Sequence, residues 1–87
     1  MPEYIVISIA KAKPEEVAKH RKSHAEYIES LKKQDILGIA GKFSDGRGGV
    51  YFLTLESGED ALRIASADPY HSSGVREFTL KEWERKY

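Results

Sequence analysis

The sequence of 87 residues predicts a single α+β domain, residues 1–87, built in the order βαββαβ. Three observations lead to this prediction. Segments rich in β-branched and aromatic residues alternate with segments in which apolar residues recur every three or four positions. Turn-forming residues separate these segments, and no internal repeat or long linker divides the chain. A chain of this length has room for one hydrophobic core.

The first half of the chain is predicted to form a strand, a long helix and a second strand. Residues 4–10 are almost continuously apolar, which favours a central strand interrupted only by Ser8. Pro14 and the two acidic residues after it mark the start of a helix over about 14–33, because proline and acidic side chains both suit a first helical turn. Residues 36–43 are predicted to form a strand whose two glycines indicate a bulge or a close approach.

The second half is predicted to form a hairpin, a short helix and a last strand. The expected elements are a turn at 44–49, a strand at 50–55, a helix at 61–67 capped by Ser57 or Gly58, a loop at 70–74 and a strand at 75–83. Two βαβ halves with right-handed crossovers place both helices on one face of a four-stranded antiparallel sheet. The other face would be bare and apolar, so we expect it to pack on a second copy of the chain.

Composition argues against several classes of function. Lysine plus arginine equals aspartate plus glutamate at 14 each, whereas a nucleic-acid-binding chain usually carries a basic excess. No apolar run approaches the length of a membrane span. The chain has no cysteine, which excludes disulfides and thiolate metal sites. Met1-Pro2-Glu3 leads directly into a predicted strand, so we expect no secretion signal and a cytoplasmic location.

His24 is the first candidate for chemistry. It lies midway along the predicted helix face that carries Val17, Arg21, Ile28 and Leu31, where a purely structural helix would have leucine or alanine. Imidazole titrates near neutral pH and serves as an acid, a base or a ligand. The alternative interpretation is a core histidine that hydrogen-bonds a backbone carbonyl.

Asp68 is the second candidate. A carboxylate beside an imidazole fixes its tautomer and raises its basicity, which prepares a general base. The alternative is a turn aspartate whose side chain folds onto the backbone of residues 70 and 71. Arg21, one helical turn before His24, either clamps an anionic group or lies in solvent beside acidic residues.

The remaining polar features carry less information. His20 and His71 are expected at the surface. The glycine-rich turn at 46–49 lacks the following helix that a phosphate-binding loop needs. No spacing of histidine, aspartate and glutamate resembles a metal site, so we expect neither a metal nor a cofactor.

The assembled pattern resembles the YCII-related (YciI-like) family over nearly the whole chain. The resemblance rests on Arg21-x-x-His24-x-x-Tyr27-x-x-x-Leu31, on Gly38-Ile39-Ala40-Gly41, on Ala65-Ser66-Ala67-Asp68-Pro69-Tyr70 ahead of Gly74, and on a closing strand with Trp83. It implies a ferredoxin-like fold that pairs sheet to sheet as a dimeric α+β barrel, similar to muconolactone isomerase and cofactor-free monooxygenases. It also implies a histidine–aspartate pair in a cleft, here His24 and Asp68. One branch resembles a dehydrochlorinase of a chlorinated hydroxyhydroquinone, which implies lyase or isomerase chemistry. The short loop at 44–49 departs from larger relatives, so the substrate is not carried over.

The hypotheses for function belong to four classes. The first is a cofactor-independent enzyme in which His24, oriented by Asp68, moves a proton on a small aromatic or enolisable substrate, while Arg21, Ser8 or Tyr70 holds polar groups. The second is a non-catalytic module that binds or senses a small molecule or an anion in the same cleft. The third is haem binding through His24, and the fourth is a structural partner domain. The first hypothesis requires that the side chains of residues 24 and 68 meet at an open hollow.

Overall fold

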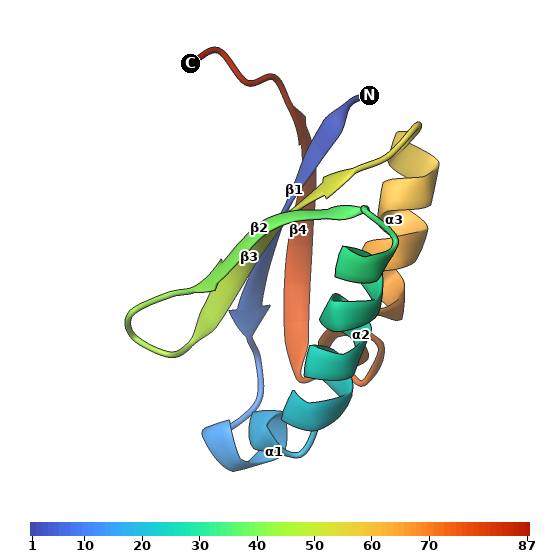
Figure 1. Ribbon diagram of the computed structural model, residues 1–87. Coiled ribbons are helices and arrows are strands. Elements are labelled where there is room, and N and C mark those ends of the chain that lie inside the picture. Colours follow the sequence, from blue (N-terminus) through green and yellow to red (C-terminus); the bar gives the residue numbers. More distant parts are fainter.

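Four antiparallel strands form one sheet in the order β2-β3-β1-β4 in the computed structural model, which describes residues 1–87 (Figure 1). The strands are β1 (Glu3–Ala10), β2 (Leu37–Lys42), β3 (Gly48–Thr54) and β4 (Arg76–Trp83). β1 pairs with β3 on one side and β4 on the other, which confirms the central position predicted from its apolar run. With the helices on one face, this is the predicted ferredoxin-like βαββαβ fold.

Four helices connect the strands: α1 (Pro14–Ala18), α2 (Arg21–Lys33), α3 (Gly58–Ala67) and α4 (Pro69–Ser72). α2 and α3 lie side by side against one face of the sheet (Figure 1). The side chain of Ser57 caps α3 by accepting a hydrogen bond from the Asp60 N–H, as predicted for one of the two candidate caps.

The prediction of one continuous helix over 14–33 is wrong, because the chain breaks between α1 and α2. The N–H groups of Lys19 and His20 donate to carbonyls three residues back, so the last turn of α1 tightens and the α-helical pattern stops. The break lets Val17 pack against Tyr70 and Val75 in a small cluster separate from the main core.

The predicted loop over 70–74 is also wrong in part, because it contains the single turn α4. Proline suits the first position of this turn, and the side chain of Asp68 accepts a hydrogen bond from the Tyr70 N–H. Gly74, at φ +83°, follows the turn and leads into β4. In β2 the register shifts between Leu37 and Ala40, which confirms the bulge indicated by the glycines.

The main core lies between the sheet and the pair α2 and α3. Alternate residues of the two central strands face it, and the core cluster consists of Tyr4, Val6, Leu31, Tyr51, Leu53, Leu55, Ala61, Ile64 and Ala65. The helices bury their apolar faces here, which is the main source of stability for helices of this length.

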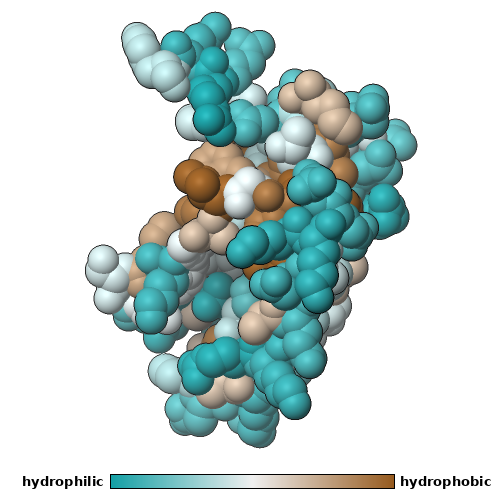
Figure 2. All heavy atoms as spheres, in the orientation of Figure 1, coloured by the Kyte–Doolittle hydropathy of each residue, from teal (hydrophilic) through white to brown (hydrophobic).

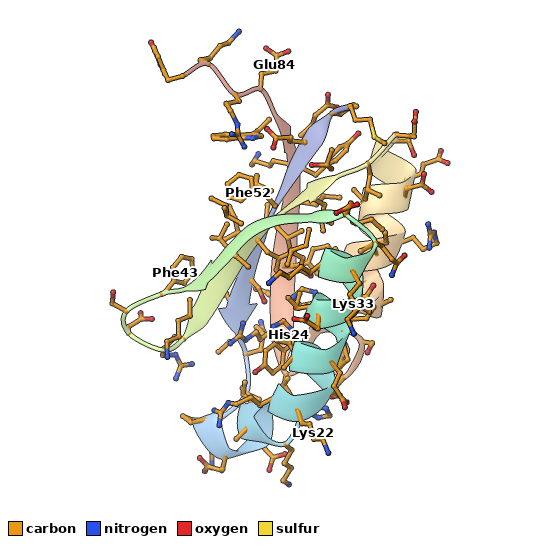
Figure 3. The ribbon with its side chains drawn as sticks, viewed as in Figure 1. Lys22, His24, Lys33, Phe43, Phe52 and Glu84 are labelled. Atoms are coloured by element: carbon orange, nitrogen blue, oxygen red, sulfur yellow. The ribbon has the colours of Figure 1, made fainter.

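The opposite face of the sheet carries no helix. Apolar atoms are visible at the left of the sheet, away from α2 (Figure 2), and Phe52 projects to this side (Figure 3). Phe52 contacts Trp83 with ring centroids 5.1 Å apart. Large apolar side chains on this face and its edge stay exposed, among them Ile9, Ile39 and Trp83 at 43%, 70% and 41%. None of the helices is long and apolar enough to cross a lipid bilayer.

Candidate functional site

A cleft of about 860 Å³ opens between the β2–β3 hairpin, the start of α2 and the sheet. This volume suits a small organic ligand. In the space-filling view the surface is hollowed between the hairpin and α2 (Figure 2). The lining includes Ser8 from β1, Arg21 and His24 from α2, and Tyr70 from α4. The structure therefore brings four of the five sequence-predicted site residues to one hollow.

Asp68, the fifth, lies directly behind His24 and has no exposed surface. Its Oδ1 is 2.8 Å from His24 Nδ1. A carboxylate only accepts hydrogen bonds, so Nδ1 carries a proton, and in the neutral form of the ring Nε2 is a lone-pair acceptor. No hydrogen bond within the chain engages Nε2, and His24 lies on the sheet-facing side of α2 with 22% of its side chain exposed (Figure 3). This is the geometry of a prepared general base or acid.

Two further donors hold the Asp68 carboxylate. The Tyr70 N–H donates to Oδ1 and the Tyr51 hydroxyl donates to Oδ2, each over 2.9 Å. Burial alone raises the pKa of Asp68, but the hydrogen bond and charge of His24, together with the Tyr70 N–H, outweigh it and lower the pKa overall. Asp68 is therefore ionised at neutral pH. Burial and the charge of Asp68 raise the pKa of Tyr51, so its hydroxyl stays a donor.

The position of Asp68 fits both interpretations of the sequence, the turn aspartate and the partner of the imidazole. The same Oδ1 caps α4 through the Tyr70 N–H and contacts the His24 imidazole. The capping aspartate and the partner of the imidazole are one group because the capped turn begins immediately beside α2.

The Tyr70 ring fixes the plane of the imidazole. It stacks on His24 with centroids 4.1 Å apart and 23° between the planes. The guanidinium carbon of Arg76 lies 4.1 Å from the same centroid, so His24 and Arg76 occupy opposite faces of the tyrosine. Tyr70 is only 4% exposed, which makes it a packing partner of His24 as well as part of the cleft wall.

His71, which was expected at the surface, is partly exposed, but both of its ring nitrogens contact other groups of the chain. Its Nδ1 lies 2.7 Å from the Ala65 carbonyl oxygen and its Nε2 lies 2.8 Å from Ser8 Oγ. Because a carbonyl only accepts, Nδ1 carries the proton, Nε2 accepts, and the Ser8 hydroxyl donates. Burial lowers the pKa of His71, which favours this neutral form. Ser8 consequently turns its lone pairs, rather than its proton, to the cleft. His20 is partly exposed.

The lining carries an excess of positive charge that the sequence pattern did not indicate. It includes four cationic side chains, Arg21, Lys42, Arg47 and Arg76, and one carboxylate, Asp45. Glycines of the hairpin let its two strands approach closely: a Cβ on Gly49 would lie 2.3 Å from the Gly41 carbonyl oxygen. No group of three or more histidine, cysteine, aspartate or glutamate side chains lies in an arrangement that could hold a metal ion.

Sequence reasoning missed three contributors to the site. Tyr51 lies within the predicted strand at 50–55 without being singled out, although a tyrosine on a buried face needs a hydrogen-bond partner and so signals a polar group nearby. His71 and Arg76 gave no signal, because their roles depend on the packing of α4 and β4 against the cleft.

Fold and site together define a small α+β domain with a histidine–aspartate pair at the base of a cleft. Comparison with known proteins gives the family: the model of the YCII-related domain matches residues 1–84, and the chain belongs to this family. Among curated proteins it is similar to the uncharacterized protein YjpA of Bacillus subtilis (strain 168), with 40% identity over 67 residues, which cover 77% of this chain and 79% of that protein.

Among solved structures the chain is similar to 5-chloro-2-hydroxyhydroquinone dehydrochlorinase (TftG) from Burkholderia phenoliruptrix AC1100, determined in complex with 2,5-dihydroxybenzoquinone. The TM-score is 0.80, with 15% sequence identity and coverage of 97% of this chain and 95% of that chain. At this level of identity the likeness establishes the shared fold.

Proposed function

We propose that the chain is a cofactor-independent enzyme of lyase or isomerase type in which His24 moves a proton on a small enolisable or aromatic substrate. One observation carries the proposal: the imidazole is held by a buried, ionised carboxylate at 2.8 Å while its other nitrogen is left unbonded at a cleft. The similar dehydrochlorinase, whose structure holds a small hydroxylated quinone, supports a small-molecule role.

The proton transfer follows from the hydrogen-bond polarity of the pair. His24 Nε2 takes a proton from the substrate, and the resulting imidazolium is stabilised by the Asp68 carboxylate behind it. The same imidazolium then returns the proton to another position or to a leaving group. A positioned general base contributes roughly 10²–10⁴-fold to the rate. Asp68 and Tyr70 act as positioning residues, because they orient the ring without reaching the reacting atoms.

Ser8 and Arg21 are proposed to bind the substrate. Ser8 offers an acceptor to a substrate hydroxyl, since its own proton is committed to His71. Arg21 is the first residue of α2 and lines the cleft, where its guanidinium offers donors to a substrate oxygen. The Tyr70 ring contributes an apolar wall beside His24.

The test is solvent exchange catalysed by the purified chain. In D₂O, NMR follows deuterium entering the ring C–H positions of 2,5-dihydroxybenzoquinone, an exchange that requires protonation and deprotonation at carbon and no cofactor. The wild-type chain should exceed the buffer rate, and His24→Gln should lose about 10²-fold or more of that excess. His20→Gln is the matched control and should keep it. Binding of this quinone without any exchange above buffer would favour the binding module instead.

We also propose that the helix-free face of the sheet packs against the same face of a second copy of the chain. Ile5, Ile7 and Phe52 on this face are half-buried and Ile9 is exposed, which is a continuous apolar surface that a lone domain seldom leaves in water. Two-fold pairing of the same face would hide it on both copies. Light scattering should report a dimer at micromolar concentration, and a monomer there would contradict this pairing.

A further inference from the structure

The cationic side chains around the cleft come from four separate elements. Arg21 begins α2, Lys42 ends β2, Arg47 lies in the turn of the hairpin and Arg76 begins β4. These residues are scattered along the sequence, so their meeting is a product of the fold. The hairpin that carries two of them projects from the sheet opposite α2 (Figure 1).

None of the four forms an ion pair within the chain. The salt bridges of lysine and arginine in the structure engage Lys11, Lys19, Arg63, Arg85 and Lys86, all outside the cleft. The one carboxylate in the lining, Asp45, uses its Oδ1 to accept the backbone N–H of Arg47, as in a turn. The Arg76 Nε is buried without a hydrogen-bond partner. With Asp45 counted, the lining therefore keeps an excess of positive charge that no ion pair within the chain engages.

This local excess contrasts with the whole chain, whose formal net charge is zero. Like charges gathered at one hollow repel one another, so the arrangement does not stabilise the fold. A concave site lined by one sign of charge concentrates ligands of the opposite sign. A bound anion would offset the repulsion and would accept hydrogen bonds from the guanidinium groups.

We infer that the substrate of this cleft is a small organic anion whose charged group, a carboxylate or a ring enolate, binds Arg47 and Lys42 at the hairpin end. Its uncharged part then extends toward His24, between Arg21 and the Tyr70 wall. This inference uses the cleft of the proposed function and names the class of its substrate. The charged group serves to orient the molecule, whereas the proton moves at the His24 end.

The experiment compares two ligands that share a dihydroxybenzene ring and carry either a carboxylate or a neutral carboxamide. Calorimetry at neutral pH measures binding of 2,5-dihydroxybenzoate and of the uncharged 2,5-dihydroxybenzamide. The wild-type chain should prefer the anion by about tenfold or more, and this preference should decrease as salt is raised. The double variant Lys42→Gln/Arg47→Gln should lose most of the preference while binding the amide unchanged.

Lys22→Gln/Lys33→Gln provides a control with the same change in net charge. Both lysines are exposed on α2 and lie outside the cleft lining (Figure 3), so this variant should bind the anion like the wild type. Thermal unfolding verifies that each variant is folded. Equal affinity for acid and amide, or equal losses in the two double variants, would overturn the inference.

The outcome is distinguishable from a failure of the proposed function. His24→Gln should still prefer the anion, because the imidazole lies at the other end of the proposed ligand. If the wild type prefers the anion but catalyses no exchange, the substrate class stands and the enzyme proposal fails. If exchange occurs without any preference for the anion, the enzyme proposal stands and this inference fails.

Discussion

Replacing Tyr51 by phenylalanine tests whether the buried carboxylate depends on its hydroxyl partner. The Tyr51 hydroxyl donates to Asp68 Oδ2 over 2.9 Å, and it is the one donor to that oxygen in the structure. Phenylalanine keeps the ring in the core and removes only this donor. A buried hydrogen bond to a charged group contributes about 1.5–3 kcal/mol, so we expect Tyr51→Phe to lower the free energy of unfolding by about 2 kcal/mol.

Tyr27→Phe is the matched comparison. The Tyr27 hydroxyl donates over 2.7 Å to the carbonyl oxygen of Ile64, a neutral acceptor. A hydrogen bond between neutral groups contributes roughly 0.5–1.5 kcal/mol, so this variant should lose about half as much. For a domain of this size, 1 kcal/mol shifts Tm by roughly 4–8 °C, and urea unfolding at neutral pH separates the two variants.

The sign of the pH dependence provides the second readout. The pKa of Asp68 is lowered in the folded chain, so its contribution to stability is present above the unfolded pKa of 3.8 and is lost as pH falls through the folded pKa. Removing the Tyr51 donor raises the folded pKa and shrinks this contribution. The excess loss in Tyr51→Phe over Tyr27→Phe should therefore decline on acidification below 3.8. Equal losses in the two variants at neutral pH would refute the reasoning.

Three further variants probe other features. The pKa of His71 is lowered in the folded chain, so the free energy of unfolding should fall as the pH drops from the unfolded pKa of 6.5 toward the folded pKa. Urea unfolding across that range should show a flatter pH dependence in His71→Gln. The control variant His20→Gln should keep the pH dependence of the wild type. Phe52→Glu places a charge on the helix-free face and should give a folded monomer by light scattering; an unchanged dimer would locate the interface elsewhere. A Cβ on Gly48 would lie 2.1 Å from a backbone oxygen of β1, so Gly48→Ala should lower the free energy of unfolding by about 3 kcal/mol. Gly48 also has φ +150°, a second source of strain for alanine. Gly46→Ala, at φ +74° with open space, should lose only about 1 kcal/mol, and equal losses would contradict the combined cost of crowding and backbone strain at Gly48.

The order of elements was accessible from the sequence because each strand and helix carries a local signal. The apolar run of β1 predicted a central strand, and the spacing along α2 placed His24 on the inner face. The break before α2 was not predictable, since Lys19 and His20 are acceptable helix residues. The chain bends there because Val17 packs into a cluster with residues far along the sequence.

The residues of the site also divide into those that the sequence predicted and those that it did not. His24 stood out because a histidine on an apolar helix face departs from a purely structural pattern, whereas the resemblance to the family paired Asp68 with it. His71 did not, because nothing near it in the sequence shows that its ring nitrogens reach Ala65 and Ser8. The positive lining was hidden by a net charge of zero, which describes the whole chain and not the distribution of charge over its surface.

One Asp68 oxygen both caps α4 and contacts His24, and this has a consequence for how the sequence can change during evolution. A replacement at position 68 that lacks a side-chain acceptor removes the cap of α4 and the partner of the imidazole in the same step, so folding and the proposed chemistry are coupled there. The hairpin turn at 44–47 has no such dual role. New ligand preferences should therefore arise by exchange of residues in that turn, on a scaffold in which the carboxylate stays fixed.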